Sequence, residues 1–302
     1  MRAIVTGGAG FIGSHVADAL LERRDEVTVV DDLSHGRREN VAAGARLAVL
    51  DVRDPGLAAV FDDARPEVCF HLAAQADVRV SVERPDFDAD VNVLGTIRVL
   101  EAARRDGAQV VFASTGGAIY GECDEPAPET AARLPLAPYG ASKLAAEEYL
   151  ATWNRLYGTT HVTLRYGNVY GPRQDPHGEA GVVAIFFGRL AGGRRPQIFG
   201  DGLQTRDYVY VGDVVGATLA AVGHPGGVFN VGTGRETSVV ELFDTCRAVA
   251  GASVEPEFAD PRLGELRRSV LDASLAATEL GWRAGTALAD GLGATWESIA
   301  AA

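Results

Sequence analysis

Tyr139 and Lys143 form a Tyr-x-x-x-Lys pattern at the start of a predicted helix. Residues four apart lie on one helix face, so the ammonium of Lys143 can approach the phenol of Tyr139. A nearby positive charge lowers the pKa of a tyrosine from its usual value of about 10, which makes Tyr139 a candidate general base near neutral pH. Ser114 and Thr115, which end the preceding predicted strand, could hydrogen-bond the same substrate oxygen. These four are the candidate catalytic residues, although the tyrosine and lysine spacing alone also occurs on ordinary surface helices.

A glycine-rich turn near the start of the chain predicts a phosphate-binding site. Residues 5–15 read Val-Thr-Gly-Gly-Ala-Gly-Phe-Ile-Gly-Ser-His, which satisfies Gly-x-Gly-x-x-Gly between an apolar strand and an apolar helix. Glycine at positions such as Gly7, Gly10 and Gly13 permits a tight turn and brings backbone N–H groups close to a pyrophosphate. The positive end of the helix that follows then faces the anion.

Asp31 indicates which dinucleotide this turn binds. It ends the second predicted strand, 18 residues after Gly13. A carboxylate there can hydrogen-bond a ribose 2′-hydroxyl and would repel a 2′-phosphate, which favours NAD over NADP. Two alternatives stay open: Asp31 and Asp32 could be solvated in a plain strand turn, and Arg37 and Arg38 in the next loop could hold a phosphate.

Predicted strands and helices alternate through the first half of the chain. The strands occupy residues 2–6, 26–31, 47–51, 68–73, 109–113 and 162–166, and helices span residues 11–24, 87–105 and 138–157, with another from about residue 55. This alternation predicts an α/β fold with a Rossmann-type, doubly wound parallel sheet. Ligands bind at the carboxyl ends of such strands. The residues predicted there are Asp51, Val52, Leu72, Ala73, Ala74, Gln75, Asn92, Ser114 and Thr115.

The regular alternation stops after residue 166. Residues 167–206 are rich in Gly, Pro and Arg, which indicates irregular structure around a ligand. We therefore predict an NAD-binding Rossmann domain at residues 1–166, with a returning segment at about residues 207–234. A smaller C-terminal α/β domain, mainly within residues 167–302, is predicted to bind the substrate.

Composition excludes several classes of protein. The net charge of −13 argues against binding of nucleic acid or anionic membranes, although clustered arginines could still bind a phosphorylated substrate. The sequence contains no apolar run long enough for a membrane span, and its first residues enter a strand without a signal peptide, which predicts a cytoplasmic protein. Three scattered cysteines predict no disulfide framework, and the scattered histidines predict no metal site.

Further stretches carry recognisable motifs. They include Phe-His-Leu-Ala-Ala-Gln at 70–75, Arg-Tyr-Gly-Asn-Val-Tyr-Gly-Pro-Arg at 165–173, and residues 31–34, 112–115, 206–209, 230–232 and 280–282. With the glycine turn and the Tyr-x-x-x-Lys pattern, these motifs resemble the extended short-chain dehydrogenases/reductases, and within them the UDP-hexose 4-epimerases. The resemblance covers essentially the whole chain.

The resemblance implies a tightly held NAD that takes a hydride from carbon 4 of a UDP-sugar while Tyr139 takes the hydroxyl proton. The resulting 4-keto sugar would turn and regain the hydride on its other face. It also implies a homodimer formed through the helices at 87–105 and 138–157. The residues predicted to contact the cofactor are Gly7, Gly10, Phe11, Ile12, Gly13, Asp31, Asp32, Asp51, Val52, Leu72, Ala73, Ala74, Gln75, Asn92, Tyr139, Lys143 and Tyr166.

The resemblance also implies how the UDP-sugar is bound. Asn168 would contact the diphosphate, and Arg206 and Arg262 would hold phosphates and ribose, roles that suit bidentate arginine donors. Surface or salt-bridged arginines are the alternative for both positions. The backbone of Val182 and Val183 would contact the uracil.

Three more residues belong to this predicted substrate site. Phe199 could stack on the uracil or be an ordinary buried aromatic. Glu265 would accept a hydrogen bond from a ribose hydroxyl, although residues 261–265 read Pro-Arg-Leu-Gly-Glu where the family more often has Arg-Pro-Gly-Asp. Ser269 falls at the wall position that limits the substituent on carbon 2. This small residue predicts tolerance of UDP-N-acetylhexosamines as well as UDP-glucose and UDP-galactose.

Other reactions on the same fold remain open. Related 4,6-dehydratases place an Asp-Glu pair near the site, whereas this chain has Gly116 and Gly117 after Thr115. The carboxylates of the following loop, residues 122–125, could enter the pocket instead or form a solvated loop. The alternatives are thus a 4,6-dehydratase-type enzyme, an epimerase of a UDP-uronate or deoxysugar, and a non-catalytic dinucleotide sensor.

Overall fold

The computed structural model describes residues 1–175, 181–261 and 266–300. Seven parallel strands form its central sheet, in the order β11-β6-β5-β4-β1-β2-β3. Their bounds are Arg2–Thr6 (β1), Glu26–Asp31 (β2), Arg46–Val49 (β3), Val68–His71 (β4), Gln109–Thr115 (β5), Val162–Tyr166 (β6) and Gly227–Val231 (β11). The predicted Rossmann-type doubly wound sheet is therefore confirmed.

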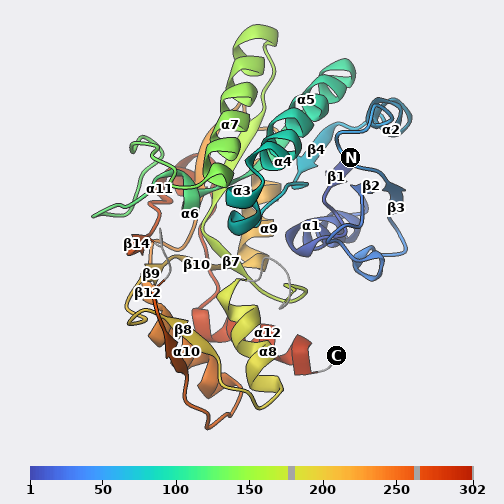
Figure 1. Ribbon diagram of the computed structural model, residues 1–302. Helices are drawn as coiled ribbons and strands as arrows, with labels where there is room; N and C mark the ends of the chain where they lie inside the picture. The colour runs from blue at the N-terminus through green and yellow to red at the C-terminus, as the bar shows by residue number, and fades with distance from the viewer. Residues whose placement is uncertain (176–180, 262–265, 301–302) are drawn as a thin grey trace.

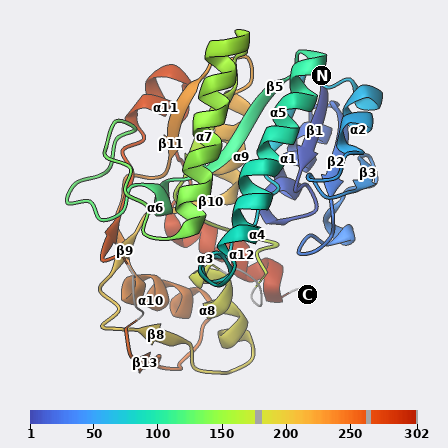
Figure 2. The ribbon, with the colours of Figure 1, turned by 45° about the horizontal axis from the view of Figure 1, so that its top comes forward.

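Helices cover both faces of the sheet, which explains the nearly continuous apolar character of its inner strands. On one face, α1 (Phe11–Glu22) and α9 (Val211–Ala220) pack together with side chains such as Leu20 and Val214. On the other, α2 (Leu57–Ala64), α5 (Gly95–Asp106) and α7 (Pro138–Tyr157) bury side chains such as Phe61 and Leu100. Figure 2 shows α5 and α7 side by side across the sheet.

The helix predicted over residues 87–105 is present and contains a π-helical turn. It consists of α4 (Pro85–Ala89), a π-helical turn η2 (Asp90–Leu94) and α5. The wider turn surrounds Asn92, whose buried side chain bonds the backbone of Gln75 and the hydroxyl of Ser142. Such tertiary bonds are invisible in the local apolar pattern, so the sequence predicted the helix but not its π-helical turn.

A second lobe lies below the sheet in Figure 1. Helices α8 (Val182–Ala191), α10 (Val239–Val249) and α12 (Leu288–Ala300) surround a core that contains Phe186, Phe187 and Phe243. The short strands pair as β10-β7, β12-β9-β14 and β13-β8. Their bounds are Asn168–Tyr170 (β7), Gln197–Phe199 (β8), Thr205–Arg206 (β9), Tyr208–Tyr210 (β10), Thr237–Ser238 (β12), Glu257–Ala259 (β13) and Arg268–Ser269 (β14).

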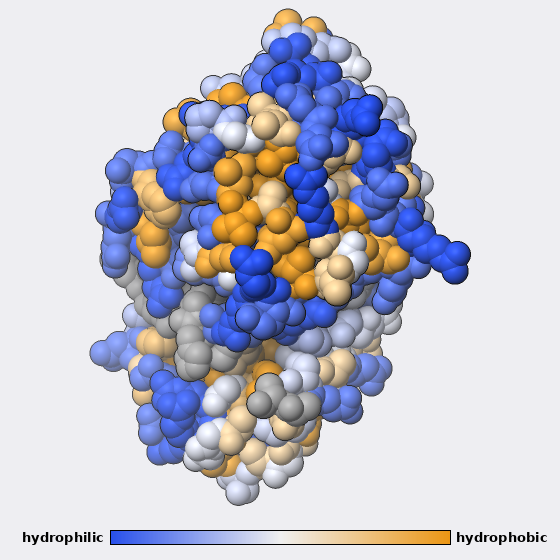
Figure 3. All heavy atoms as spheres, turned by 90° about the vertical axis from the view of Figure 1, so that its right-hand side faces the viewer, coloured by the Kyte–Doolittle hydropathy of each residue, from blue (hydrophilic) through white to orange (hydrophobic). Residues whose placement is uncertain are grey.

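The remaining elements are short. They are η1 (Arg38–Asn40), α3 (Val78–Glu83), α6 (Gly116–Ile119) and α11 (Ser274–Glu279). On the face shown in Figure 3, apolar residues gather in the middle of the upper lobe, bordered by hydrophilic ones. Within residues 1–175, 181–261 and 266–300, no helix is both long and apolar enough to cross a membrane.

Candidate active site

A cavity of about 620 Å³ opens at the carboxyl ends of the central strands. Its walls come from the β1–α1 turn, the ends of β2, β4, β5 and β6, and the start of α7. The strand order reverses between β1 and β4, and this is where a doubly wound sheet forms its ligand crevice. The predicted residues that line the cavity are Gly7, Gly10, Phe11, Ile12, Gly13, Asp31, Asp32, Asp51, Val52, Leu72, Ala73, Ala74, Gln75, Ser114, Tyr139, Lys143 and Tyr166.

The glycine turn leaves no room for side chains. Gly7 has a φ of +70°, and a Cβ on it would lie 2.7 Å from the backbone nitrogen of Ala73. A Cβ on Gly13 would overlap the carbonyl oxygen of Gly7. Helix α1 begins directly after Gly10 without a side-chain cap, so its first turn offers backbone N–H groups to an anion. This cradle fits the pyrophosphate of a dinucleotide.

Asp31 is buried at the end of β2, beside the glycine turn. Its two carboxylate oxygens accept hydrogen bonds from the backbone N–H groups of Ala9 and Leu33, each at 2.9 Å. Burial raises the pKa of Asp31 above its usual value, although these hydrogen bonds oppose the shift. The fixed carboxylate lines the cavity, as a partner of a ribose hydroxyl must. Arg37 also lines the cavity and ion-pairs with Asp175 at 3.6 Å.

Several cavity residues escaped the sequence reasoning. Arg53 follows β3 in the chain and lines the cavity, where it ion-pairs with Asp51 and Asp90, each at 2.6 Å. The Arg53 guanidinium holds the pKa of Asp51 below its usual value. Residues 173–175 form another part of the cavity wall. In the sequence, Arg173 indicated this wall because it ends the motif at residues 165–173.

Tyr139 and Lys143 come together as the Tyr-x-x-x-Lys spacing predicts. Both residues lie in the first turns of α7, which starts at Pro138, and both line the cavity. The Lys143 ammonium is buried and donates a hydrogen bond to the carbonyl oxygen of Ala113 at 2.9 Å. A Cβ on Gly140 would overlap the carbonyl oxygen of Ala118, so α6 and α7 pack closely beside Tyr139.

The two candidate hydroxyl groups have different surroundings. Ser114 is buried, and its hydroxyl donates to Oε1 of Glu147 at 2.5 Å. Thr115 is half-buried, and within the described ranges no hydrogen bond of its side chain is present. Gly117 has the hydroxyl of Thr115 and the side-chain oxygen of Asn168 as neighbours, which places Thr115 beside the predicted diphosphate contact. Ser114 lines the cavity but its hydroxyl is engaged by Glu147, whereas Thr115 lies outside the cavity wall and its hydroxyl is not engaged in this way.

Asn92 supports the cavity from behind. It is buried, and it exchanges two hydrogen bonds of 2.9 Å with the backbone of Gln75. A third bond of 3.0 Å joins it to Ser142, next to Lys143 in sequence. Asn92 is absent from the cavity wall itself, so it holds the Gln75 loop against α7.

His71 is the neutral centre of a directional hydrogen-bond chain. The Thr96 hydroxyl donates to the carbonyl oxygen of Asn92 at 2.6 Å, so it must accept from Nε2–H of His71 at 3.0 Å. Nδ1 of His71 then accepts from the Thr6 hydroxyl at 2.7 Å, and that hydroxyl accepts from the N–H of Ala73 at 3.2 Å. Complete burial lowers the pKa of His71 to about 3. The chain joins β1, β4 and the π-helical turn behind the glycine turn.

The predicted substrate residues lie mainly in the lower lobe. Asn168 starts β7, and Arg206 on β9 is the register partner of Ser269 on β14. Val182 and Val183 begin α8, and Phe199 is half-buried at the end of β8. Two predicted residues, Arg262 and Glu265, fall outside the described residues.

The loop at residues 122–125 lies apart from the cavity wall. The two carboxylate oxygens of Glu122 accept hydrogen bonds from the backbone N–H groups of Arg267 and Arg268, at 3.0 and 2.8 Å. Glu122 thus fixes the entry to β14. Its carboxylate is therefore engaged outside the cavity wall.

Comparisons with known proteins agree with this geometry. The family model described as NAD dependent epimerase/dehydratase family matches residues 3–232. A UDP-glucose 4-epimerase of Mycolicibacterium smegmatis is 49% identical and covers 98% of both chains. The structure of UDP-glucose 4-epimerase from Thermotoga maritima with UDP-glucose is 48% identical, with a TM-score of 0.96 over 99% of this chain and 98% of that one. The Thermus thermophilus UDP-glucose 4-epimerase in complex with NAD is also 48% identical, with a TM-score of 0.93 over 99% of both.

Proposed function

The chain belongs to the NAD-dependent epimerase/dehydratase family, and from this premise we propose that it interconverts UDP-glucose and UDP-galactose by NAD-dependent 4-epimerisation. The family resemblance predicted from the motifs is confirmed. The observation that carries the proposal is one cavity whose wall contains the glycine turn, Asp31, Tyr139 and Lys143 together. A cofactor and a general base can therefore act on the same sugar.

The chemistry assigned to the protein is transfer of one proton. NAD, when bound, supplies a reversible hydride acceptor for carbon 4 of the sugar. Tyr139 accepts the proton of the 4-hydroxyl and later returns it, while the Lys143 ammonium stabilises the phenolate. The Thr115 hydroxyl hydrogen-bonds the same oxygen as it becomes a ketone. Turning of the 4-keto sugar between the two hydride steps inverts carbon 4 without net oxidation.

The cofactor is assigned to the upper lobe. The N–H groups at Gly10 to Gly13 hold the pyrophosphate, and Asp31 holds the adenosine ribose. The other predicted residues that line the cavity are assigned to contacts with the two bases and two riboses of NAD. We assign this role to residues 1–166 with the returning segment at 207–234, which is supported by the pairing of β11 with β6.

The UDP-sugar is assigned to residues 167–302. Asn168 and Arg206 hold the diphosphate side, and Arg262 and Glu265 keep the roles implied by the family motifs. The backbone of residues 182–183 and the ring of Phe199 hold the uracil. The small side chain of Ser269, on β14 next to Arg206, supports acceptance of an N-acetyl group on carbon 2.

A dehydratase would need a carboxylic acid and a base near carbons 5 and 6 of the sugar. Gly116 and Gly117 supply neither. Glu122, in the loop at residues 122–125, is bonded to the backbone at the start of β14 and so does not supply the missing carboxylate. Epimerisation therefore has the stronger support.

We also propose a cytoplasmic homodimer. Large apolar side chains are exposed along α7, among them Tyr149, Leu156 and Tyr157, on the helix beside α5. The three cysteines are unpaired, which suits a reducing compartment. Static light scattering that gives the mass of a monomer at working concentration would contradict the dimer.

The test is to incubate the purified protein, without added NAD, with UDP-galactose, UDP-N-acetylglucosamine or UDP-glucuronate. We expect NMR to detect the 4-epimer and mass spectrometry to show an unchanged mass. Tyr139→Phe should abolish turnover while bound NAD is retained. Loss of water, or turnover without Tyr139, would refute the proposal.

A further inference from the structure

Glu147 lies on the same face of α7 as the catalytic pair. It follows Lys143 by one helical turn and Tyr139 by two, which places it about 12 Å along the helix from the tyrosine. Glu147 is 3% exposed, and its ion-pair partner Arg165 on β6 is 2% exposed. The charged pair is therefore part of the protein interior, although neither residue lines the cavity.

The Glu147 carboxylate joins three elements. It accepts hydrogen bonds from Nε of Arg165 at 3.0 and 3.1 Å and from Nη2 of Arg165 at 2.5 Å. It also accepts the bond from the Ser114 hydroxyl on β5. Helix α7 is thus tied to β6 at the residue before Tyr166 and to β5 at the residue before Thr115. Both neighbours belong to the predicted site.

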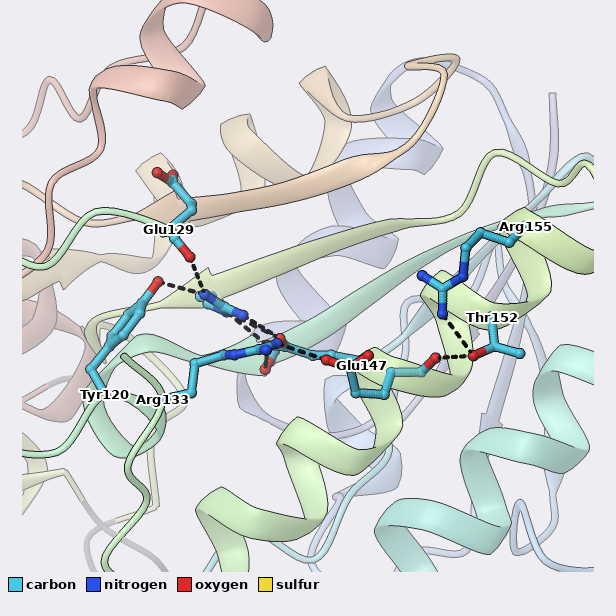
Figure 4. A network of polar contacts seen from close by, with 9 residues as sticks. Tyr120, Glu129, Arg133, Glu147, Thr152 and Arg155 are labelled. Carbon is cyan, nitrogen blue, oxygen red and sulfur yellow. Dashed lines mark hydrogen bonds and ion pairs between the residues drawn. The ribbon is translucent and has the colours of Figure 1, made fainter. Parts of the chain in front are cut away.

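The Arg165 guanidinium extends the network away from α7. Its Nη1 donates to the Tyr120 hydroxyl at 2.7 Å and to the carbonyl oxygen of Glu129 at 3.2 Å. The Tyr120 hydroxyl in turn donates to Asn230 on β11 at 2.8 Å. Figure 4 shows Tyr120, Glu129 and Glu147 gathered around one guanidinium. The pair is therefore held in one orientation from several sides.

Stability alone does not account for such a pair. Desolvation of two buried charges offsets much of their attraction, and apolar residues of similar volume often stabilise a fold as well or better. What an ion pair with several fixed partners does supply is a single geometry. A shift of about 1 Å in a catalytic group can cost about 100-fold in rate, so the rotation and height of α7 matter for turnover.

We propose that Glu147 and Arg165 are positioning residues that fix α7 on β5 and β6, so that Tyr139 and Lys143 keep their places in the cavity wall. This inference rests on the proposed 4-epimerase activity. It assigns no contact with substrate or cofactor to either residue.

The first test compares two neutral substitutions at adjacent residues. Glu147→Gln removes the buried charge with little change of shape, whereas Glu148→Gln removes the charge of a surface pair with Arg133. We expect Glu147→Gln to lower kcat about 10- to 100-fold, with KM for UDP-galactose within about threefold and bound NAD retained. Glu148→Gln should leave both constants within about twofold.

A second variant separates positioning from folding. Glu147→Gln leaves a buried guanidinium without its anion, and this alone lowers the stability of the protein. Glu147→Leu combined with Arg165→Met removes both charges, and we expect it to recover Tm while kcat remains low. Wild-type kcat in Glu147→Gln, or recovery of kcat together with Tm in the double variant, would overturn the inference. A wild-type protein inactive on UDP-hexoses would instead refute the proposed function.

Discussion

Replacement of His71 by glutamine tests the hydrogen-bond chain behind the glycine turn. Glutamine retains a donor and an acceptor but does not titrate in the range of interest. In the folded protein, complete burial lowers the pKa of His71 from its usual 6.5 to about 3. The hydrogen-bond chain also requires a neutral imidazole ring, because Nδ1 of His71 accepts from Thr6 while Nε2 donates to Thr96.

The sign of the effect follows from which state binds the proton first. Below pH 6.5 the unfolded chain protonates His71 while the folded protein does not, so the free energy of unfolding falls as the pH falls. Each pH unit between the two pKa values changes it by about 1.4 kcal/mol. Between pH 7.5 and pH 4.5, His71 should therefore remove about 3 kcal/mol of stability.

Urea unfolding of the wild type and of His71→Gln, at several pH values from 7.5 to 4.5, measures this contribution. Carboxylates titrate in both proteins, so the difference between the two curves isolates the histidine. We expect the wild type to lose about 3 kcal/mol more than the variant over the acidic interval. Parallel curves would show that His71 takes up a proton in the folded state, and the directional chain would be wrong.

Three further predictions concern the site itself. Thr115→Val should lower kcat about 10- to 100-fold with bound NAD retained, whereas Ser114→Ala should mainly lower Tm; equal kcat losses from both would reject the assignment of Thr115. Gly13→Ala should abolish bound NAD, read from the absorbance of nucleotide released on denaturation, because its Cβ would overlap the Gly7 carbonyl. Ser269→Tyr should reduce kcat/KM for UDP-N-acetylglucosamine far more than for UDP-glucose, and an unchanged ratio would count against a wall at this position.

The parts of the site that depend on nearby residues could be predicted from the sequence. The glycine turn, Asp31 and the Tyr139–Lys143 pair lie within single strand–turn–helix units, where spacing fixes the relative positions. The alternation of strands and helices likewise defined the sheet and its ligand edge. The structure contains these features as predicted because they depend only on the geometry of residues close together in the sequence.

Contacts between distant segments could not be predicted in the same way. No local pattern indicates that the Ser114 hydroxyl meets Glu147, 33 residues later, and so Ser114 and Thr115 looked equivalent. The π-helical turn at Asn92 depends on Gln75 and on α7, and the ion pair of Arg53 with Asp90 depends on η2. Each requires the tertiary arrangement that it helps to stabilise.

The pairing of β7 with β10 has a consequence for how such a chain can vary. The chain leaves the upper lobe through β7 and returns through β10, and the two strands run parallel as direct neighbours, with Asn168 opposite Tyr208. The intervening segment therefore leaves at the end of β7 and returns at the start of β10, only one short strand away, so its length or sequence can alter without lengthening the path from β6 to α9. Recognition of a new sugar can be built on this excursion while the frame that carries the cofactor keeps its dimensions.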